Sequence, residues 1–334
     1  MKTASNESLS RIGLGTYLGH LNDLTDLDLT ATIIKAINIG INHIDTAPNY
    51  RAQRSERAIG LALKSFYSKR DSLFLSSKVG FVPFEWNVPQ DDRAYLKTRF
   101  IDTGIFDEKD LIEGIQCFSP KYLEWQVNDS IARMGLGYID LLYLHNIELA
   151  FRALTKQQQE SLFKASLKSL KKMYQAGLIR YIGVASWSGF LMEDGTGLQI
   201  QELMKWVKEV DCLDIFKVIQ APFNLGMPDL LFKKTQIVDQ INMSLGRAVS
   251  QFELELVTSA PIMHGQLISL DLPELLVSAW PGLNTAQICL SMVKNAPGIM
   301  SSLVGVKSNA HFEQLQRVIN ATPITPNEYL KLLK

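Results

Sequence analysis

Four side chains that can move a proton to or from an oxygen atom stand where predicted strands end. Asp45 closes an apolar run, and Pro48 stops that strand from continuing because proline lacks an amide donor and restricts the residue before it. Tyr50 follows shortly after, while Lys78 and His145 each end a later apolar run. In a barrel of parallel strands the carboxyl ends meet at one face, where catalytic groups sit. The spacing therefore predicts a site built from a carboxylate, a phenol, an ammonium group and an imidazole.

Each of these residues also has an ordinary interpretation when taken alone. Asp45 could cap a loop, Tyr50 could be a surface aromatic, Lys78 a solvated charge and His145 a core histidine with satisfied hydrogen bonds. Their shared position at the ends of three successive predicted strands favours a joint role.

The elements that must position these residues alternate between strand and helix along the chain. Short apolar runs alternate with segments of helical periodicity, which predicts parallel strands with crossover helices. The predicted strands span 11–17, 41–45, 72–77, 138–144, 178–185, 215–220, 253–259 and 299–304. The predicted helices span 26–39, 55–66 (with Ser55 as N-cap), 120–134, 159–176, 200–209, 229–244, 285–295 and 309–320. Eight pairs predict a (β/α)8 TIM barrel of the α/β class, and we expect residues 1–334 to form a single domain.

The segment 79–119 interrupts this alternation directly after Lys78. It is longer than the usual loop between a strand and a helix, and it contains several aromatic residues. We expect an insertion after the third strand that acts as a lid, with Phe81, Phe84 and Trp86 forming walls for a substrate. The alternative is that these aromatic residues pack a long loop onto the barrel rim.

Composition excludes several classes of partner. The chain has 334 residues with 34 basic and 34 acidic side chains, so no excess charge points to nucleic acid or a membrane surface. The three cysteines, Cys117, Cys212 and Cys289, have no metal-ligand spacing and form no disulfide framework. The N-terminal stretch lacks the apolar core of a signal peptide, and no apolar run is long enough to cross a membrane. We expect a cytoplasmic protein without a metal, and a monomer is favoured over an oligomer.

The sequence around the four residues resembles the aldo-keto reductases. The matching words are Gly-Leu-Gly-Thr from residue 13, Asp-Thr-Ala-x-x-Tyr from 45, Ser-Lys-Val-Gly from 77 and Ile-Asp-Leu-Leu-Tyr-Leu-His from 139. In that family the residues matching Asp45, Tyr50, Lys78 and His145 form the catalytic tetrad. The resemblance implies reduction of an aldehyde or ketone to an alcohol, or the reverse, with a hydride from NADP(H).

The chemistry of carbonyl reduction accounts for this set of side chains. A free tyrosine has a pKa of about 10 and is a poor proton source at neutral pH, while a neighbouring lysine favours the phenolate and lowers that pKa. Asp45 would hold and balance Lys78, and His145 would donate a hydrogen bond to the developing oxyanion. Tyr50 would then be the general acid for reduction and the general base for oxidation.

The resemblance also implies a set of cofactor contacts. A lysine followed by a hydroxyl at a helix start suits the 2′-phosphate of NADPH. The alternative is that the hydroxyl only caps the helix and the lysine is solvated. The positions that match cofactor contacts are Thr16, Tyr17, Asp45, Ser186, Gln220, Phe223, Gly265, Gly305, Lys307 and Ser308.

Four positions depart from the family pattern. Trp187 replaces the usual Asn, and Ser259 replaces an aromatic residue that stacks on the nicotinamide. Gln314 and Leu315 replace a Glu-Asn pair near the adenine. We expect Trp187, with His145, to contact substrate, and either Trp187 or Phe223 to supply the missing stacking face.

Two other functions stay open at this point. The first is a regulatory or scaffold protein that binds the nucleotide and turns over slowly, like the channel β-subunits that resemble this family. The second is a barrel enzyme of another class, such as an isomerase or lyase, that uses Tyr50 as a base.

Overall fold

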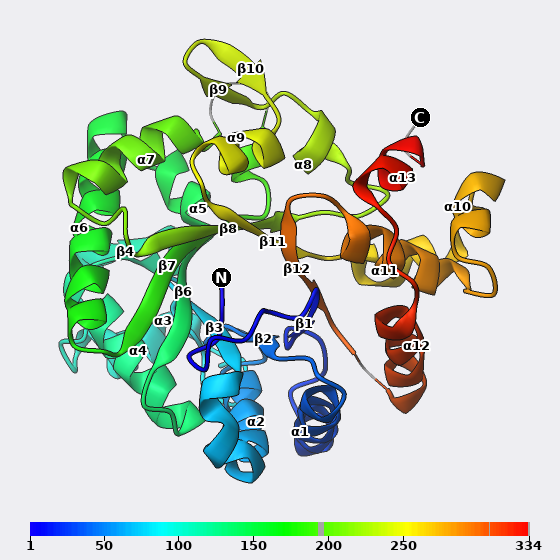
Figure 1. The fold of residues 1–334 in the computed structure, drawn as a ribbon. Coiled ribbons are helices and arrows are strands. Elements are labelled where there is room, and N and C mark those ends of the chain that lie inside the picture. The colour runs from blue at the N-terminus through cyan, green and yellow to red at the C-terminus, as the bar shows by residue number, and fades with distance from the viewer. Residues whose placement is uncertain (193–196, 307, 333–334) are drawn as a thin grey trace.

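The computed structural model describes residues 1–192, 197–306 and 308–332. Eight parallel strands close into a barrel in the order β1-β12-β11-β8-β7-β6-β3-β2 (Figure 1). The strands are β1 (Ile12–Gly15), β2 (His43–Asp45), β3 (Phe74–Val79), β6 (Ile139–His145), β7 (Ile179–Ala185), β8 (Phe216–Pro222), β11 (Glu255–Ser259) and β12 (Ile299–Val304). The predicted (β/α)8 barrel is therefore confirmed.

Helices surround the barrel and bury its outer face (Figure 1). The larger ones are α1 (Asp23–Asn38), α2 (Arg54–Leu63), α4 (Pro120–Met134), α6 (Lys156–Gln175), α7 (Ile200–Glu209), α9 (Leu245–Gln251), α11 (Thr285–Asn295) and α12 (Asn309–Asn320). The shorter ones are α3 (Asp92–Leu96), α5 (Ile147–Arg152), α8 (Asp229–Phe232), α10 (Glu274–Ala279) and α13 (Pro326–Lys331). A separate apolar cluster that includes Phe74, Leu141 and Leu303 fills the barrel interior.

Two of the predicted helices differ from the structure. The chain over 229–244 forms only the short helix α8, followed by a hairpin of β9 (Gln236–Val238) and β10 (Ile241–Met243). Burial in β9 alternates with period two, and Asp239 and Gln240 adopt positive φ at the turn, so the local pattern is that of a hairpin. In α2 the N-cap is Gln53, while Ser55 lies inside the helix and donates its hydroxyl to the carbonyl oxygen of Thr16 at 2.7 Å.

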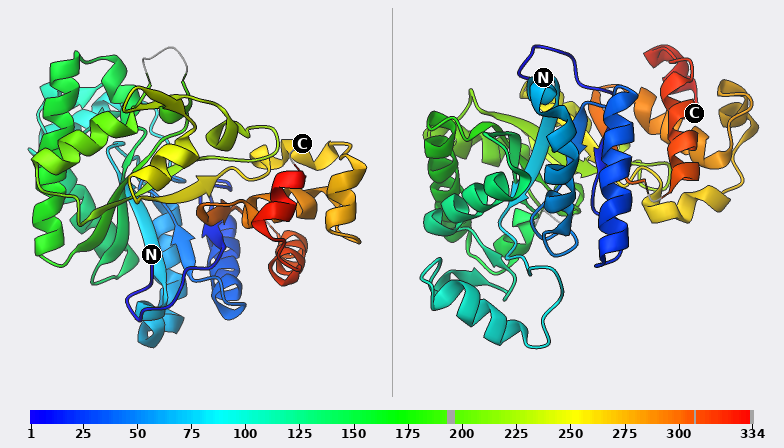
Figure 2. Two further views of the ribbon diagram at one scale, coloured as in Figure 1. Left: turned by 45° about the horizontal axis from the view of Figure 1, so that its top comes forward. Right: turned by 90° about the horizontal axis from the view of Figure 1, so that it is seen from below.

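Residues 80–119 lead from β3 to α4, and Phe100 packs against that helix. They include α3 and a hairpin of β4 (Leu111–Ile112) and β5 (Gln116–Cys117). Phe100 stacks on Phe106 and contacts Tyr122 and Trp125 of α4 edge to face. In the right view of Figure 2 the teal helical part of this segment lies at the edge of the molecule, beyond the ends of the neighbouring helices.

No helix in the described part of the chain is both long and apolar enough to span a membrane.

Candidate active site

The strand order brings the four predicted side chains to one region of the barrel. Asp45 is the last residue of β2, Lys78 lies near the end of β3, and His145 is the last residue of β6. These three strands are consecutive neighbours in the barrel. Tyr50 follows in the turn that connects β2 to α2.

A buried ion pair forms the base of the site. The Nζ atom of Lys78 donates to Oδ1 of Asp45 at 2.5 Å and to the carbonyl oxygen of Thr46 at 2.9 Å. The other oxygen of Asp45 accepts from Ser76 Oγ at 2.8 Å and from Gln220 Nε2 at 3.2 Å. Both side chains are thus paired and hydrogen-bonded, which offsets the cost of burying them.

Tyr50 lies beside this pair. Lys78 Nζ is 4.6 Å from the centroid of the Tyr50 ring. Burial raises the pKa of Tyr50, while the charge of Lys78 opposes that rise. The lysine lowers the pKa of Tyr50 as expected, but the net direction is upward. Burial of the phenol outweighs the lysine, and Tyr50 therefore carries its proton at neutral pH.

His145 is neutral at the same pH. Burial, followed by the charge of Lys78, holds the pKa of His145 well below its ordinary value. Its ring centroid lies 6.0 Å from that of Tyr50, and Phe81 packs edge to face on it at 4.9 Å. A neutral imidazole can donate one hydrogen bond to an oxygen placed between it and the phenol.

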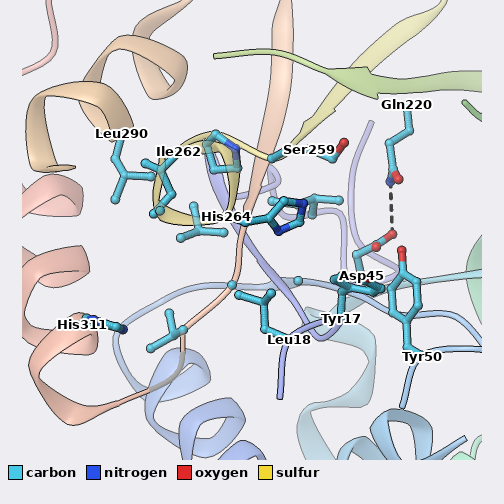
Figure 3. Close-up of a pocket in the computed structure, with 18 of the residues that line it drawn as sticks. Tyr17, Leu18, Asp45, Tyr50, Gln220, Ser259, Ile262, His264, Leu290 and His311 are labelled. Carbon is cyan, nitrogen blue, oxygen red and sulfur yellow. Dashed lines mark hydrogen bonds between the residues drawn. The ribbon is translucent and has the colours of Figure 1, made fainter. Parts of the chain in front are cut away.

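Asp45, Tyr50 and His145 line one end of a cavity of about 880 Å³. Figure 3 shows Tyr50 and Gln220 at this end and His311 at the other, with His264 and Leu18 between them. The cavity thus extends from the ion pair to the first turn of α12, and a small carbonyl compound would fill only part of it.

The predicted cofactor residues divide into three groups. Residues that line the cavity are Tyr17, Asp45, Ser186, Gln220, Gly265 and Gly305. Thr16 is buried, and its hydroxyl donates to the carbonyl oxygen of Asp45 at 3.0 Å. Phe223 is packed in the core, so the idea that it supplies a stacking face is wrong. Ser308 caps α12 by accepting from the amide of His311 at 3.2 Å, and Lys307 lies outside the described residues.

Two of the residues predicted to form substrate walls, Phe84 and Trp86, do not line the cavity. Phe81 and Trp187 line the cavity. Phe84 instead contacts Tyr95, and the Trp86 ring lies against two arginines of α2. The segment 79–119 therefore does not present Phe84 and Trp86 to a ligand, because Phe84 packs on Tyr95 of the same segment and Trp86 packs on α2. Among the cavity-lining residues of the described chain, Phe81 is the one contributed by this segment.

Glu148 and His264 lie at or near the cavity and are not predicted from the sequence. Glu148 is buried, and its Oε1 accepts from Ser186 Oγ at 2.8 Å and from the amide of Trp187 at 3.1 Å. Glu148 follows the predicted site residue His145 by three residues, and this short spacing could have indicated that it lies near the site. His264 lies at the mouth, where its ring stacks on Trp187 and tilts toward Tyr17; its remote place in the sequence gave no signal.

The chain is similar to a known group of proteins over much of its length. The model of the aldo/keto reductase family matches residues 11–207. The aldo-keto reductase YhdN of Bacillus subtilis is 29% identical over 185 residues, which cover 54% of this chain and 44% of that protein. L-galactose dehydrogenase of Arabidopsis thaliana is 26% identical over 178 residues, covering 53% of this chain and 44% of that protein. The chain thus spans less than half the length of these curated relatives.

A solved structure shares the fold over nearly the whole chain. An aldo/keto reductase from Klebsiella pneumoniae, solved in complex with NADP and acetate, has a TM-score of 0.65 at 17% identity, covering 99% of this chain and 92% of that chain. The family match covers more than half of the chain and includes Asp45, Tyr50, Lys78 and His145. On this match, the chain belongs to the aldo/keto reductase family.

Proposed function

We propose that this protein is an NADP(H)-dependent oxidoreductase that reduces an aldehyde or ketone to an alcohol, or catalyses the reverse reaction. The observation that carries the proposal is the placement of Lys78 between Asp45 and Tyr50, both of which line the cavity. The unit that performs the reaction is the single barrel domain, since the cavity draws residues from β1 through α12.

The cavity suits a nicotinamide nucleotide in volume and in its polar groups. Gln220 donates to Asp45, which leaves its Oε1 as an acceptor for an amide N–H. Ser186 gives its proton to Glu148 and already accepts from the amide of Gly189 at 2.8 Å, so toward a ligand its hydroxyl can only accept. Asn146 accepts from the Trp187 amide at 3.1 Å, which leaves its own amide group as a donor for a carboxamide oxygen. The family usually has an Asn where this chain has Trp187. Asn146 thus supplies the amide donor that Trp187 lacks.

The bound nucleotide supplies the hydride, because no protein side chain can do so. In reduction, the carbonyl oxygen gains negative charge and takes the phenolic proton of Tyr50. Lys78 then stabilises the phenolate that is left behind. His145 donates a hydrogen bond to the same oxygen and fixes its orientation. In oxidation, Tyr50 removes the proton from the alcohol.

The preference for the phosphorylated nucleotide rests on Lys307 and Ser308 at the start of α12. A cation and a hydroxyl at a helix N-terminus match a phosphate dianion. The Klebsiella pneumoniae relative was solved with NADP, which agrees with this assignment.

The substrate end of the cavity favours an uncharged carbonyl compound. Phe81, Trp187 and Tyr17 supply aromatic walls there. None of the described residues that line the cavity is a lysine or arginine, so a carboxylate or phosphate on the substrate would lose its hydration without gaining a cation. We therefore expect neutral aldehydes and ketones to react faster than keto acids or sugar phosphates.

A fluorescence titration with NADPH, followed by a turnover screen on neutral and anionic carbonyl compounds, tests this function. Binding with turnover supports the proposal. Binding without turnover on any carbonyl compound would favour the nucleotide-binding regulatory role, and no binding would exclude both.

A further inference from the structure

The backbone directly after Tyr50 adopts a conformation that side chains disfavour. Arg51, Ala52 and Gln53 have φ values of 51°, 50° and 68°, and each of these three consecutive residues carries a Cβ atom. The left-handed region is unfavourable for such residues because Cβ approaches the following carbonyl oxygen. This left-handed turn joins Tyr50 to α2, so a change in the turn would move the phenol.

An ion cluster holds the left-handed turn on the side of α1. Asp26 accepts from the guanidinium of Arg51 with one carboxylate oxygen and from that of Arg54 with the other. The side chains of the two arginines are 2% and 8% exposed, and that of Asp26 is 16% exposed. Arg51 also donates twice to the carbonyl oxygen of His20, at 3.1 and 2.8 Å. One carboxylate thus ties Arg51, the first residue of the turn, and Arg54, the residue after the turn, to each other and to α1.

Trp86 holds the left-handed turn from the opposite side. Its amide donates to the carbonyl oxygen of Ala52 at 3.0 Å, and its carbonyl oxygen accepts from Arg54 Nε at 2.9 Å. Its ring lies 5.0 Å from the guanidinium carbon of Arg54 and 4.0 Å from that of Arg57, distances that allow cation–π attraction. Trp86 does not line the cavity that contains Tyr50.

We propose that Asp26 and Trp86 are positioning residues that hold the left-handed turn and thereby aim Tyr50 at the reacting oxygen. The inference rests on the proposed role of Tyr50 in proton transfer. Neither residue lines the cavity, so their loss acts on the proton-transfer step rather than on binding. Misplacing a reacting group by about 1 Å can cost about 10²-fold in rate.

The test uses Asp26→Asn, with Asp23→Asn as a matched control. Asp23 also lies on α1 and contacts Arg54 at 3.0 Å, but its side chain is 92% exposed. We expect Asp26→Asn to lower kcat by about 10-fold while the carbonyl KM and the NADPH Kd change by less than about 2-fold. Asp23→Asn should leave all three values unchanged.

A rescue separates positioning from general loss of structure. Ala52→Gly removes the Cβ that opposes the left-handed conformation, so adding it to Asp26→Asn should recover most of the lost kcat. If kcat fell while KM and Kd rose to a similar extent, and Ala52→Gly did not reverse these changes, the proposal would be overturned. An unchanged kcat in Asp26→Asn would also overturn it. If Asp26→Asn fails to fold, Trp86→Leu removes the cation–π contacts and should lower kcat in the same selective way. Trp86→Leu keeps the backbone hydrogen bonds of residue 86, so an unchanged kcat in this variant would reject the role of the Trp86 ring.

Amide hydrogen exchange keeps this inference distinct from the proposed function. Exchange of the amides of Arg54 and Trp86, which donate to the carbonyl oxygens of Arg51 and Ala52 in the turn, should accelerate in Asp26→Asn. It should return toward the original rate when Ala52→Gly is added, whether or not the protein turns over a carbonyl compound. Unchanged exchange would reject the restraint on the turn. Absence of turnover in the unmodified protein, with the expected exchange pattern, would reject only the proposed reaction.

Discussion

The ammonium group of Lys78 lies 4.6 Å from the centroid of the Tyr50 ring. The phenol is buried, and burial raises its pKa while Lys78 opposes that rise. Tyr50 can therefore hold a proton at neutral pH and still release it to an adjacent alkoxide, because the phenolate left behind faces a cation.

This relationship predicts unequal effects on the two directions of the reaction. Lys78→Met removes the cation and leaves burial unopposed, so the pKa of Tyr50 rises further. Oxidation requires the phenolate and should fall by more than about 10²-fold, with its pH profile displaced to higher pH. Steady-state rates in both directions from pH 6 to 10 measure this. Equal losses in both directions with an unmoved profile would argue against the pairing.

The nucleotide preference can be tested at Lys307. Lys307→Ala should weaken NADPH binding by about 10-fold or more, because a charge-assisted hydrogen bond to phosphate is lost. NADH, which lacks that phosphate, should bind with unchanged affinity. Fluorescence titrations with both nucleotides make the comparison, and equal affinity of the unmodified protein for the two would refute the assignment.

Phe81 and Phe84 form a matched pair for testing the substrate wall. Phe81 lines the cavity and packs on His145, whereas Phe84 contacts Tyr95. Phe81→Ala should raise the carbonyl KM several-fold or change the ranking of substrates, and Phe84→Ala should do neither. The same kinetic effect from both variants would contradict this placement.

The buried histidines predict a loss of stability in acid. Burial lowers the pKa of His43 to about 4, with Asp45 opposing and Lys78 adding to that shift. His43 takes up a proton at about pH 6.5 in the unfolded chain but only at about pH 4 in the folded protein. The free energy of unfolding therefore falls as pH drops through this window. The full shift is worth roughly 3 kcal/mol. Urea unfolding at pH 7 and pH 4.5 should show a smaller loss of unfolding free energy for His43→Asn than for the unmodified protein, and an equal loss would exclude His43 as a source.

Most of the fold could be predicted because the strands and helices repeat a simple pattern. The alternation of apolar runs with helical periodicity identified the eight barrel strands, and α4, α7, α11 and α12 begin and end where the sequence predicts. The segment 229–244 is an exception, since a helix is predicted there and the structure has a short helix and a hairpin. Its hairpin depends on two positive φ angles at Asp239 and Gln240, which composition does not indicate.

The four site residues could be placed because their positions follow from strand ends alone. The direction of a loop side chain does not follow in this way. Trp86 lies close to Lys78 in sequence, yet its ring turns outward to the guanidinium groups of Arg54 and Arg57. The direction of the Trp86 side chain is set by its contacts with α2, and the residues next to Trp86 in the sequence do not indicate these contacts.

The role of Tyr50 as the proton donor is tested most directly by Tyr50→Phe, with turnover and NADPH binding measured on the same preparation. The variant keeps the ring that packs between Tyr17 and His145 and loses only the hydroxyl. Tyr95→Phe, which removes a hydroxyl outside the cavity, serves as the control. We predict unchanged NADPH affinity and a loss of at least about 10²-fold in kcat for Tyr50→Phe, with near-normal turnover in the control. Near-normal turnover in Tyr50→Phe would contradict the account.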